Sequence, residues 1–362
     1  MKLGIVGLPN VGKTTLFNAL TGSKAATSSY AYTSVTPNIG VAKVPDSRLD
    51  WLAELYDPDK YTPATVDFVD VAGLARGASR GEGLGNAFLQ AIRQTDALLH
   101  VVRCFDNEDM FVEPADARRD AEALELELIL ADIEVVERRM EKAKKASKSG
   151  DKKYVQEEQL CAALLEHLSN GKAARYFDFG TAGKDILADG GLLSVKPVIY
   201  AANLSEDSMA DYTADPHYQA LAELAGEQNA AVFPVSARFE EEIGEMDPED
   251  AQMFMEELGL KERSLGRLIR CSYNLLGLIS FLTAGKPEVR AWTITKGTKA
   301  PRAAGKIHSD IERGFIRAEI VAFDDLKACG SMAAAKEKGL VRLEGKDYVM
   351  KDGDVTLFRF NV

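Results

Sequence analysis

Cysteine and histidine are scarce in this chain, and long apolar runs are missing. Its 362 residues include 4 cysteines and 4 histidines, and the cysteines form no Cys-x-x-Cys pair. This spacing argues against a zinc site and against a disulfide framework, and it favours a reduced compartment. No uninterrupted apolar stretch is long enough to span a bilayer, and the apolar start is too short for a signal peptide. We therefore expect a cytoplasmic protein with no membrane partner.

Basic residues are fewer than acidic ones, and the formal net charge is −12 at pH 7. This balance argues against non-specific binding of nucleic acid over the whole surface, but it leaves room for a local basic face. Residues 286–317 depart from the average, with eight basic and three acidic residues. The bases are Lys286, Arg290, Lys296, Lys299, Arg302, Lys306, Arg313 and Arg317.

The first motif is Gly-Leu-Pro-Asn-Val-Gly-Lys-Thr at residues 7–14. An apolar run over 3–6 precedes it and a helical pattern over 16–20 follows, which is the context of a phosphate-binding loop. Glycines let backbone N–H groups wrap around phosphate oxygens, and the start of the helix adds its positive end. In such a loop Lys13 reaches the β- and γ-phosphates, and the Thr14 hydroxyl binds Mg²⁺.

Strand-like and helix-like segments alternate through the first hundred residues, and strands return near residue 200. Strands are expected at 3–6, 66–71, 97–102, 197–202 and 231–235, and crossover helices at 16–20 and 86–95. This alternation is typical of a doubly wound α/β domain. We assign residues 1–114 and 191–277 to this domain.

Residues 117–145 contain no glycine or proline and predict a long helix. Its apolar residues recur at helical spacing: Leu126, Ile129, Leu130, Ile133, Val136 and Met140. A second helix with Leu160, Leu164 and Leu168 on one face follows a polar turn. We interpret residues 115–190 as an inserted helical arm whose two helices pack on each other. Its charged tip, residues 142–153, is either a solvated turn or a contact surface.

The last unit, residues 278–362, reads as a small α+β fold. Strands are expected at 288–295, 316–321, 348–350 and 355–360, and a helix at 303–311.

A second motif places Asp70 at the end of a strand and Gly73 three residues later. In P-loop NTPases an Asp at this point holds Mg²⁺, and the Gly N–H contacts the γ-phosphate. The following segment, 73–85, is dense in glycine, as a conformational switch requires. A hydroxyl between the first helix and the next strand would complete the metal shell, and Thr33, Ser34 and Thr36 compete for this role. Lys13 and Gly73 are the expected contacts to the transition state.

The third motif indicates whether the bound nucleotide carries adenine or guanine. Asn203-Leu204-Ser205-Glu206 stands where GTPases usually carry Asn-Lys-x-Asp, whose Asp accepts from two guanine donors. The longer Glu206 disturbs that geometry, and adenine does not need the carboxylate, so we favour ATP over GTP. Ser236 lies in a segment that resembles the last nucleotide loop, whose backbone runs beside the base.

These strings together resemble the YchF family of Obg-like ATPases, within the translation-factor-related P-loop GTPases. The carrying residues are the loop at 7–14, Phe68–Leu74, Gly77–Asn86, Val101–Phe105, Asn203–Glu206 and Gly345–Asp354, so the resemblance covers nearly the full length. It implies a G domain, a helical or coiled-coil arm, and a C-terminal TGS domain with a ubiquitin-like β-grasp. It also implies ATP hydrolysis and association with ribosomes, for which the basic TGS face at Lys286–Arg317 is the expected contact.

The resemblance transfers roles position by position. Asn10, Val11, Gly12, Lys13, Thr14 and Thr15 match the ATP-phosphate stretch. Thr14 and Ser34 match the Mg²⁺ ligands, although the family usually has Thr at the second position. Leu204 matches the adenine contact. Asn10 also resembles the K⁺-ligand Asn of potassium-activated GTPases, which implies K⁺ as a second cation.

The catalytic group is not identified. Leu74 occupies the place of the water-positioning Gln of Ras-like GTPases, and an apolar side chain cannot orient water. The family has a His in the loop after residues 101–105, but residues 105–112 of this chain contain none. His100 precedes that loop and is expected to pack within its strand. We therefore expect slow ATP hydrolysis.

Three functions remain open. The leading one is an Mg²⁺-dependent ATPase switch on ribosomes. A GTPase ribosome-assembly factor of the Obg type and a nucleotide-gated scaffold with incidental hydrolysis are the alternatives.

Overall fold

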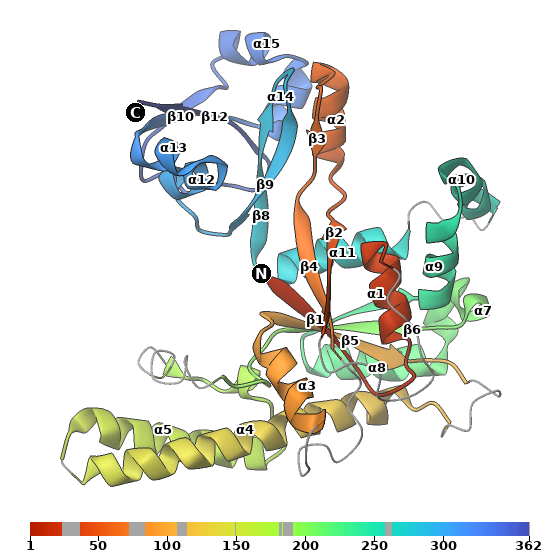
Figure 1. Cartoon of the computed structure of the whole chain (residues 1–362), viewed down its shortest axis with the longest axis vertical. Helices are drawn as coiled ribbons and strands as arrows, with labels where there is room; N and C mark the ends of the chain where they lie inside the picture. The colour runs from red at the N-terminus through yellow and green to blue at the C-terminus, as the bar shows by residue number, and fades with distance from the viewer. Residues whose placement is uncertain are drawn as a thin grey trace. The chain divides into compact units, whose positions relative to one another are not determined.

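The computed structural model describes residues 1–23, 37–71, 84–106, 114–148, 150–180, 183, 191–257 and 263–361. The chain divides into two compact units (Figure 1). The first contains residues 1–40 and 67–265, and the second contains residues 41–66 and 266–362.

The first unit is built on a six-stranded sheet with the order β2-β4-β1-β5-β6-β7. The strands are β1 (Lys2–Val6), β2 (Asn38–Lys43), β4 (Thr65–Asp70), β5 (Ala97–Arg103), β6 (Val198–Asn203) and β7 (Ala231–Val235). From β4 to β7 each neighbouring pair is parallel. Every residue of β5 is buried, as a central parallel strand covered on both faces requires. The predicted α/β domain is confirmed.

Helices cover both faces of this sheet (Figure 1). The helices of this unit outside the arm are α1 (Lys13–Thr21), α3 (Leu84–Arg93), α7 (Glu206–Met209), α8 (Pro216–Glu227), α9 (Ala237–Glu245), α10 (Pro248–Glu257), which lies away from the sheet, and the first residues of α11 (Ser264–Leu275). Phe88 and Ile92 of α3 pack with Val6 and Leu98 of the strands in one apolar cluster. α1 and α9 pack on each other at the opposite face.

The predicted helical arm is confirmed as α4 (Ala117–Ser147) and α5 (Lys152–Ser169), which lie side by side (Figure 1). Asp116 and Asp151 cap the two helix starts by accepting from backbone N–H groups, and Lys144 and Lys145 lie in the last turn of α4. Ile129 and Val136 pack with Cys161, Leu164 and Leu168, so the apolar stripe is internal. Leu126 departs from that prediction and is 50% exposed.

The base of the arm is tied down by a buried carboxylate. Asp132 is fully buried and accepts from the Leu193 N–H at 2.7 Å, the Ser194 N–H at 2.8 Å and the Ser194 hydroxyl at 2.6 Å. Burial raises the pKa of Asp132, and these hydrogen bonds act in the opposite direction. The contact joins α4 to the segment that leads into β6.

The second unit has its own six-stranded sheet with the order β11-β10-β12-β8-β9-β3. The strands are β3 (Tyr61–Thr62), β8 (Leu278–Ala284), β9 (Val289–Thr295), β10 (Phe315–Ala322), β11 (Arg342–Glu344) and β12 (Asp354–Phe360). The helices are α2 (Ser47–Tyr56), the rest of α11, α12 (Ala300–Ile307), α13 (Ser309–Arg313), α14 (Phe323–Cys329) and α15 (Met332–Glu337). The parallel β8–β12 pair, the β8–β9 hairpin and the covering α12 form the predicted β-grasp-like domain.

Residues 41–66 belong to this second unit, although we expected the C-terminal fold to begin at 278. β3 pairs in parallel with β9, and α2 packs on β8 and β9. Arg48 binds Asp46 and Asp352, with Nη1 2.8 Å from the Asp352 carboxylate. The C-terminal fold therefore incorporates a segment from near the start of the chain.

Two local predictions in the second unit were wrong. The helix expected at 303–311 is two helices, because His308 has extended backbone (φ −161°) and its Nδ1 accepts from the N–H of Asp310. Residues 348–350 form no strand, and Val349 makes only an isolated bridge to Lys299. Met350 is buried in the core nevertheless, which accounts for the apolar pattern.

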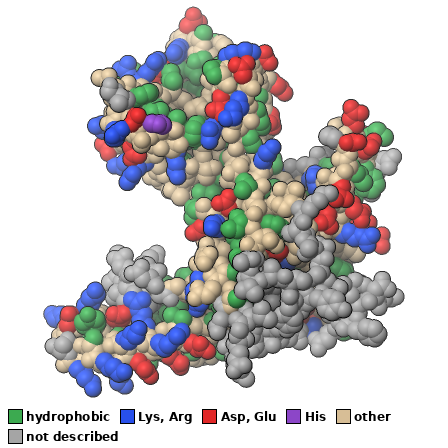
Figure 2. Space-filling view, in the orientation of Figure 1, with side chains coloured by type: hydrophobic (Ala, Val, Ile, Leu, Met, Phe, Trp, Pro, Cys, Tyr) green, Lys and Arg blue, Asp and Glu red, His purple; other side chains and the backbone are tan. Residues whose placement is uncertain are grey.

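All four cysteines are free. Acidic side chains gather over α9 and α10 (Figure 2). Among the described residues, no helix combines the length and the apolar character needed to cross a membrane.

Candidate nucleotide-binding site

The predicted nucleotide motifs converge at one edge of the first sheet. β1, β4, β6 and β7 end at Val6, Asp70, Asn203 and Val235, and the parallel registers bring these ends together. The crevice beyond the carboxyl ends of parallel strands is where open α/β sheets bind ligands.

The loop between β1 and α1 depends on close approaches that only glycine permits. A Cβ on Gly7 would lie 2.5 Å from the Val101 carbonyl oxygen, and one on Gly12 would lie 2.4 Å from Asn203 Nδ2. Gly12 also has φ +90° and Asn10 has φ +60°, both in the left-handed region. Gly12 starts α1 without a side-chain cap, so the first N–H groups of this helix are left for a ligand.

Lys13 and Asp70 are buried and form a polar cluster with the half-buried Thr14. The Thr14 hydroxyl donates to Asp70 Oδ2 at 3.1 Å, and Lys13 Nζ donates to the Leu8 carbonyl at 2.6 Å. Burial lowers the pKa of Lys13 to about 8 and raises that of Asp70, while the attraction between the two charges opposes both shifts. Asn38 also hydrogen-bonds Asp70. Sequence reasoning missed Asn38, whose only signal was a polar residue opening β2.

Asn203 ties two loops together. Its Nδ2 donates to the Val11 carbonyl at 2.9 Å, and its Oδ1 accepts from the Ala237 N–H at 2.9 Å. Asn203 is 4% exposed and Ser236 is 2% exposed, so both are part of the floor of the site. Ala237 belongs to the segment 234–238 that resembles the last nucleotide loop, but its bond to Asn203 was not predicted, because a backbone N–H carries no residue-type signal.

Leu204 and Glu206, the other residues of the base motif that we singled out, differ in their burial. Leu204 is buried, and its N–H donates to the Val235 carbonyl at 2.8 Å. Glu206, at the start of α7, is half exposed, and Arg238 Nε lies 3.9 Å from its carboxylate. The structure therefore places Asn203 and Leu204 in the floor and turns Glu206 toward solvent.

Several predicted residues lie outside the described part of the chain. They are Thr33, Ser34, Thr36, Gly73, Leu74 and most of the loop after Phe105. His100 is described, and it packs in β5 as expected, with its ring 5.3 Å from that of Tyr200. Burial lowers the pKa of His100 to about 3, which keeps the ring neutral.

The site consists of a strand, a glycine loop and a helix, with a Thr–Asp pair beside a buried Lys. This combination defines a P-loop NTPase. Comparison with known proteins identifies the family within this class. Residues 2–145 match the family described as "50S ribosome-binding GTPase", and residues 278–361 match the YchF-GTPase C-terminal family, described as "Protein of unknown function (DUF933)". The chain is 50% identical to the Bacillus subtilis ribosome-binding ATPase YchF, with 99% of each chain covered.

Two further relatives agree. The chain is 41% identical to Obg-like ATPase 1 of Oryza sativa, covering 100% of this chain and 92% of that one. The solved structure of the Schizosaccharomyces pombe YchF GTPase superposes with a TM-score of 0.87 at 36% identity, covering 99% and 97% of the two chains. The chain belongs to the YchF family of Obg-like ATPases.

Proposed function

We propose that this protein is a cytoplasmic, Mg²⁺-dependent ATP hydrolase that changes conformation with its nucleotide and associates with ribosomes. The observation that carries the proposal is the cluster of Lys13, Thr14 and Asp70 at the start of α1, beneath a loop held by Asn203. Phosphates would bind the backbone N–H groups from Asn10 to Thr15.

The Thr14 and Asp70 oxygens suit a magnesium ion. They lie 3.1 Å apart in a partly buried site, and hydroxyl and carboxylate oxygens are the ligands that Mg²⁺ prefers. The metal would neutralise phosphate charge, with Ser34 as the proposed further ligand. Asn10 at the loop is the proposed K⁺ ligand. Lys13 and Gly73 would contact the γ-phosphate.

Adenine is the favoured base. Leu204 is buried where an NTPase specific for guanine has Lys, and the Glu206 carboxylate lies near Arg238 on the solvent side. A site that lacks a placed acceptor gains nothing from the two guanine donors. The names of the relatives divide between ATPase and GTPase, so the nucleotide must be measured. Equilibrium binding of ATP and GTP to the full chain tests this, and a clear preference for GTP would support the alternative of an Obg-type GTPase.

The ribosome is proposed as partner from the relatives' names and from charge on the second unit. Five bases of the 286–317 run face local acids or a ring: Lys286 binds Asp57, Lys299 binds Asp347, Arg302 binds Glu312, Arg313 binds Asp310, and Arg290 stacks on Trp292. Lys296, Lys306 and Arg317 are exposed and make no ion pair with the described residues. Arg317 lies on the face of β10 opposite to the face of the buried Ala318. The basic residues of the 286–317 run therefore do not form one continuous face.

This distribution dictates the ribosome experiment. Removing residues 278–362 would strip α2 and β3 of their packing partners, so point variants are preferable. We expect the pair Lys296→Glu and Lys306→Glu to weaken co-sedimentation with ribosomes, and Lys346→Glu, an exposed base outside the run, to leave it unchanged. Equal binding by all variants would remove the basic run from the proposal.

The variant Gly73→Ala distinguishes the scaffold function from the hydrolytic switch. This change keeps the backbone N–H but adds a Cβ and restricts the backbone at the proposed γ-phosphate contact, and it leaves the loop at 7–14 intact. If such a variant binds ATP, fails to hydrolyse it and still supports the cellular function, the scaffold function is favoured over the hydrolytic switch.

A further inference from the structure

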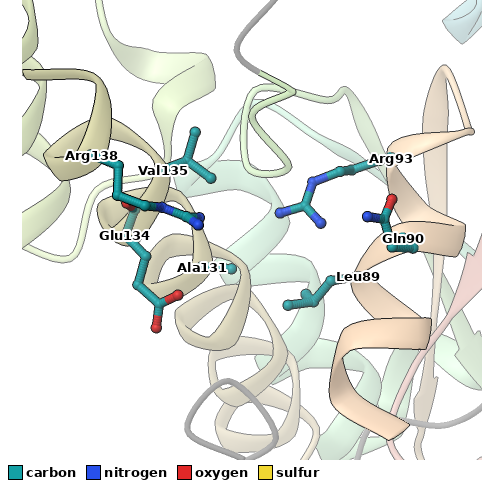
Figure 3. A pocket seen from close by; sticks show the side chains of 7 residues that line it. All are labelled: Leu89, Gln90, Arg93, Ala131, Glu134, Val135 and Arg138. Carbon is teal, nitrogen blue, oxygen red and sulfur yellow. The ribbon is translucent and has the colours of Figure 1, made fainter. Parts of the chain in front are cut away.

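A second cavity lies in the first unit, away from the loop at 7–14. It has a volume of about 410 Å³ and opens between α3 and α4 (Figure 3). Arg93 of α3 and Arg138 of α4 enter it from opposite walls, and Figure 3 shows the two guanidinium groups pointing toward one another. Gln90 adds an amide on the α3 side, whereas the Glu134 carboxylate is turned away from both arginines.

Within the described residues, neither arginine of this cavity is paired directly with a carboxylate, although Arg93 is close enough to the buried Asp132 for their attraction to lower the pKa of that carboxyl, against the effect of its burial. Arg138 is held in place by its Nε, which donates to the Glu134 carbonyl at 3.1 Å on the same helix. The Asp132 carboxylate accepts its three hydrogen bonds from residues 193 and 194, and none of them comes from Arg93.

The walls add a minor share of apolar surface to the polar lining. Leu89 of α3 and Ala131 and Val135 of α4 line the same space. Sites for small molecules typically have volumes of about 300–1,000 Å³ and combine such surface with a few placed polar groups. The cavity therefore has the size for a metabolite, and its lining is predominantly polar.

We propose that this cavity binds a small phosphorylated metabolite with a diphosphate or two phosphate groups, independently of the nucleotide at the loop. A guanidinium presents a planar fork of N–H donors that matches phosphate oxygens, and two forks facing each other can each hold one phosphate group. The limited volume between the two helices suits a small metabolite better than the backbone of RNA. A ligand there would bridge α3, which directly follows the glycine-rich segment 73–83, to the base of the arm.

Titration calorimetry on the full chain tests the proposal, with inorganic pyrophosphate as the probe. The loop at 7–14 is first saturated with a non-hydrolysable ATP analogue, so that any further binding belongs to another site. We expect one additional pyrophosphate per chain. Arg138→Gln and Arg93→Gln should each weaken it about tenfold or more, as the loss of a charge-assisted hydrogen bond predicts.

Two control variants sharpen the result. Lys142→Gln removes an exposed charge from the same helix outside the cavity and should leave pyrophosphate affinity unchanged, whereas Glu134→Gln should maintain or tighten it. Arg138, Glu134 and Lys142 are exposed, so these variants do not test folding. The absence of a second binding event, affinity unaffected by either arginine, or competition by an RNA oligomer without binding of free pyrophosphate would each overturn the proposal.

Discussion

The side-chain amide of Asn203 donates a hydrogen bond to the carbonyl oxygen of Val11 at 2.9 Å, and this bond links the end of β6 to the phosphate loop. The same amide accepts from the Ala237 N–H, so one residue fixes two loops of the proposed nucleotide site. Any change that removes this side chain should alter the ligand site before it alters the remainder of the sheet.

Asn203→Ala tests this link. The variant leaves the buried Val11 carbonyl and Ala237 N–H without a partner, at a cost of about 1–3 kcal/mol for each group. We expect nucleotide affinity to fall at least tenfold, measured with a fluorescent ATP analogue. Asn18→Ala, on the buried side of α1, is the comparison, and equal losses in both variants would indicate a general effect of destabilisation.

Gly12→Ala should abolish nucleotide binding. Its Cβ would lie 2.4 Å from Asn203 Nδ2, and φ at this position is +90°. Gly22→Ala is the matched control, because φ is +64° there but no atom lies within 4 Å of the added Cβ. The control should lose about 1 kcal/mol of stability and keep its affinity for ATP. Retained binding in Gly12→Ala would contradict the loop geometry.

Glu206→Asp should raise the affinity for GTP relative to ATP. The shorter side chain restores the residue type that pairs with the two guanine donors, and bonds of this kind discriminate strongly. Competition binding measures the ratio for the wild type and the variant. Asp207→Glu alters the neighbouring residue with the reverse change in length, and its ratio should equal that of the wild type.

Asp132→Ala should loosen the base of the arm. Three buried donors on Leu193 and Ser194 lose their acceptor, so a destabilisation of about 3 kcal/mol or more is expected. Asp151→Ala removes only an exposed helix cap and should cost about 1 kcal/mol. Thermal unfolding and limited proteolysis near residues 191–197 report both effects, and equal stability of the two variants would refute the anchor.

His100 should make the first unit sensitive to acid. Its pKa is lowered to about 3 in the folded state, against an ordinary value near 6.5 when unfolded. The unfolded state therefore binds the proton first, and stability present above about pH 6.5 is lost as pH falls toward 3, at up to about 1.4 kcal/mol per pH unit. Unfolding midpoints at pH 7 and pH 5 should differ less in His100→Leu than in the wild type.

The strongly periodic parts of the fold could be predicted from the sequence. The arm helices, β7 and the loop at 7–14 have local patterns that specify their structure, and Asp70 lies at the end of β4 as its apolar run indicated. His308 interrupts a helix through its backbone angle, which composition does not reveal.

Relationships between distant residues were harder to predict. Asn203 was predicted as a base contact, but its hold on Val11 depends on strand register and on the missing side chain of Gly12. Arg93 and Arg138 stand on separate helices, and neither belongs to a motif. Residues 41–66 carry no mark that assigns them to the C-terminal fold, because the pairing partner of β3 is remote in the chain.

That pairing also sets an order of events during synthesis. Tyr61 of β3 meets Val289 of β9, so the partner emerges more than two hundred residues later. At about 5–20 residues per second, the early segment waits roughly 10–50 s. Leu49 and Leu52, fully buried in the finished protein, have no C-terminal strands to cover them during that interval. The nascent chain therefore carries an uncovered apolar helix until translation is nearly complete, and its second domain cannot fold one end at a time.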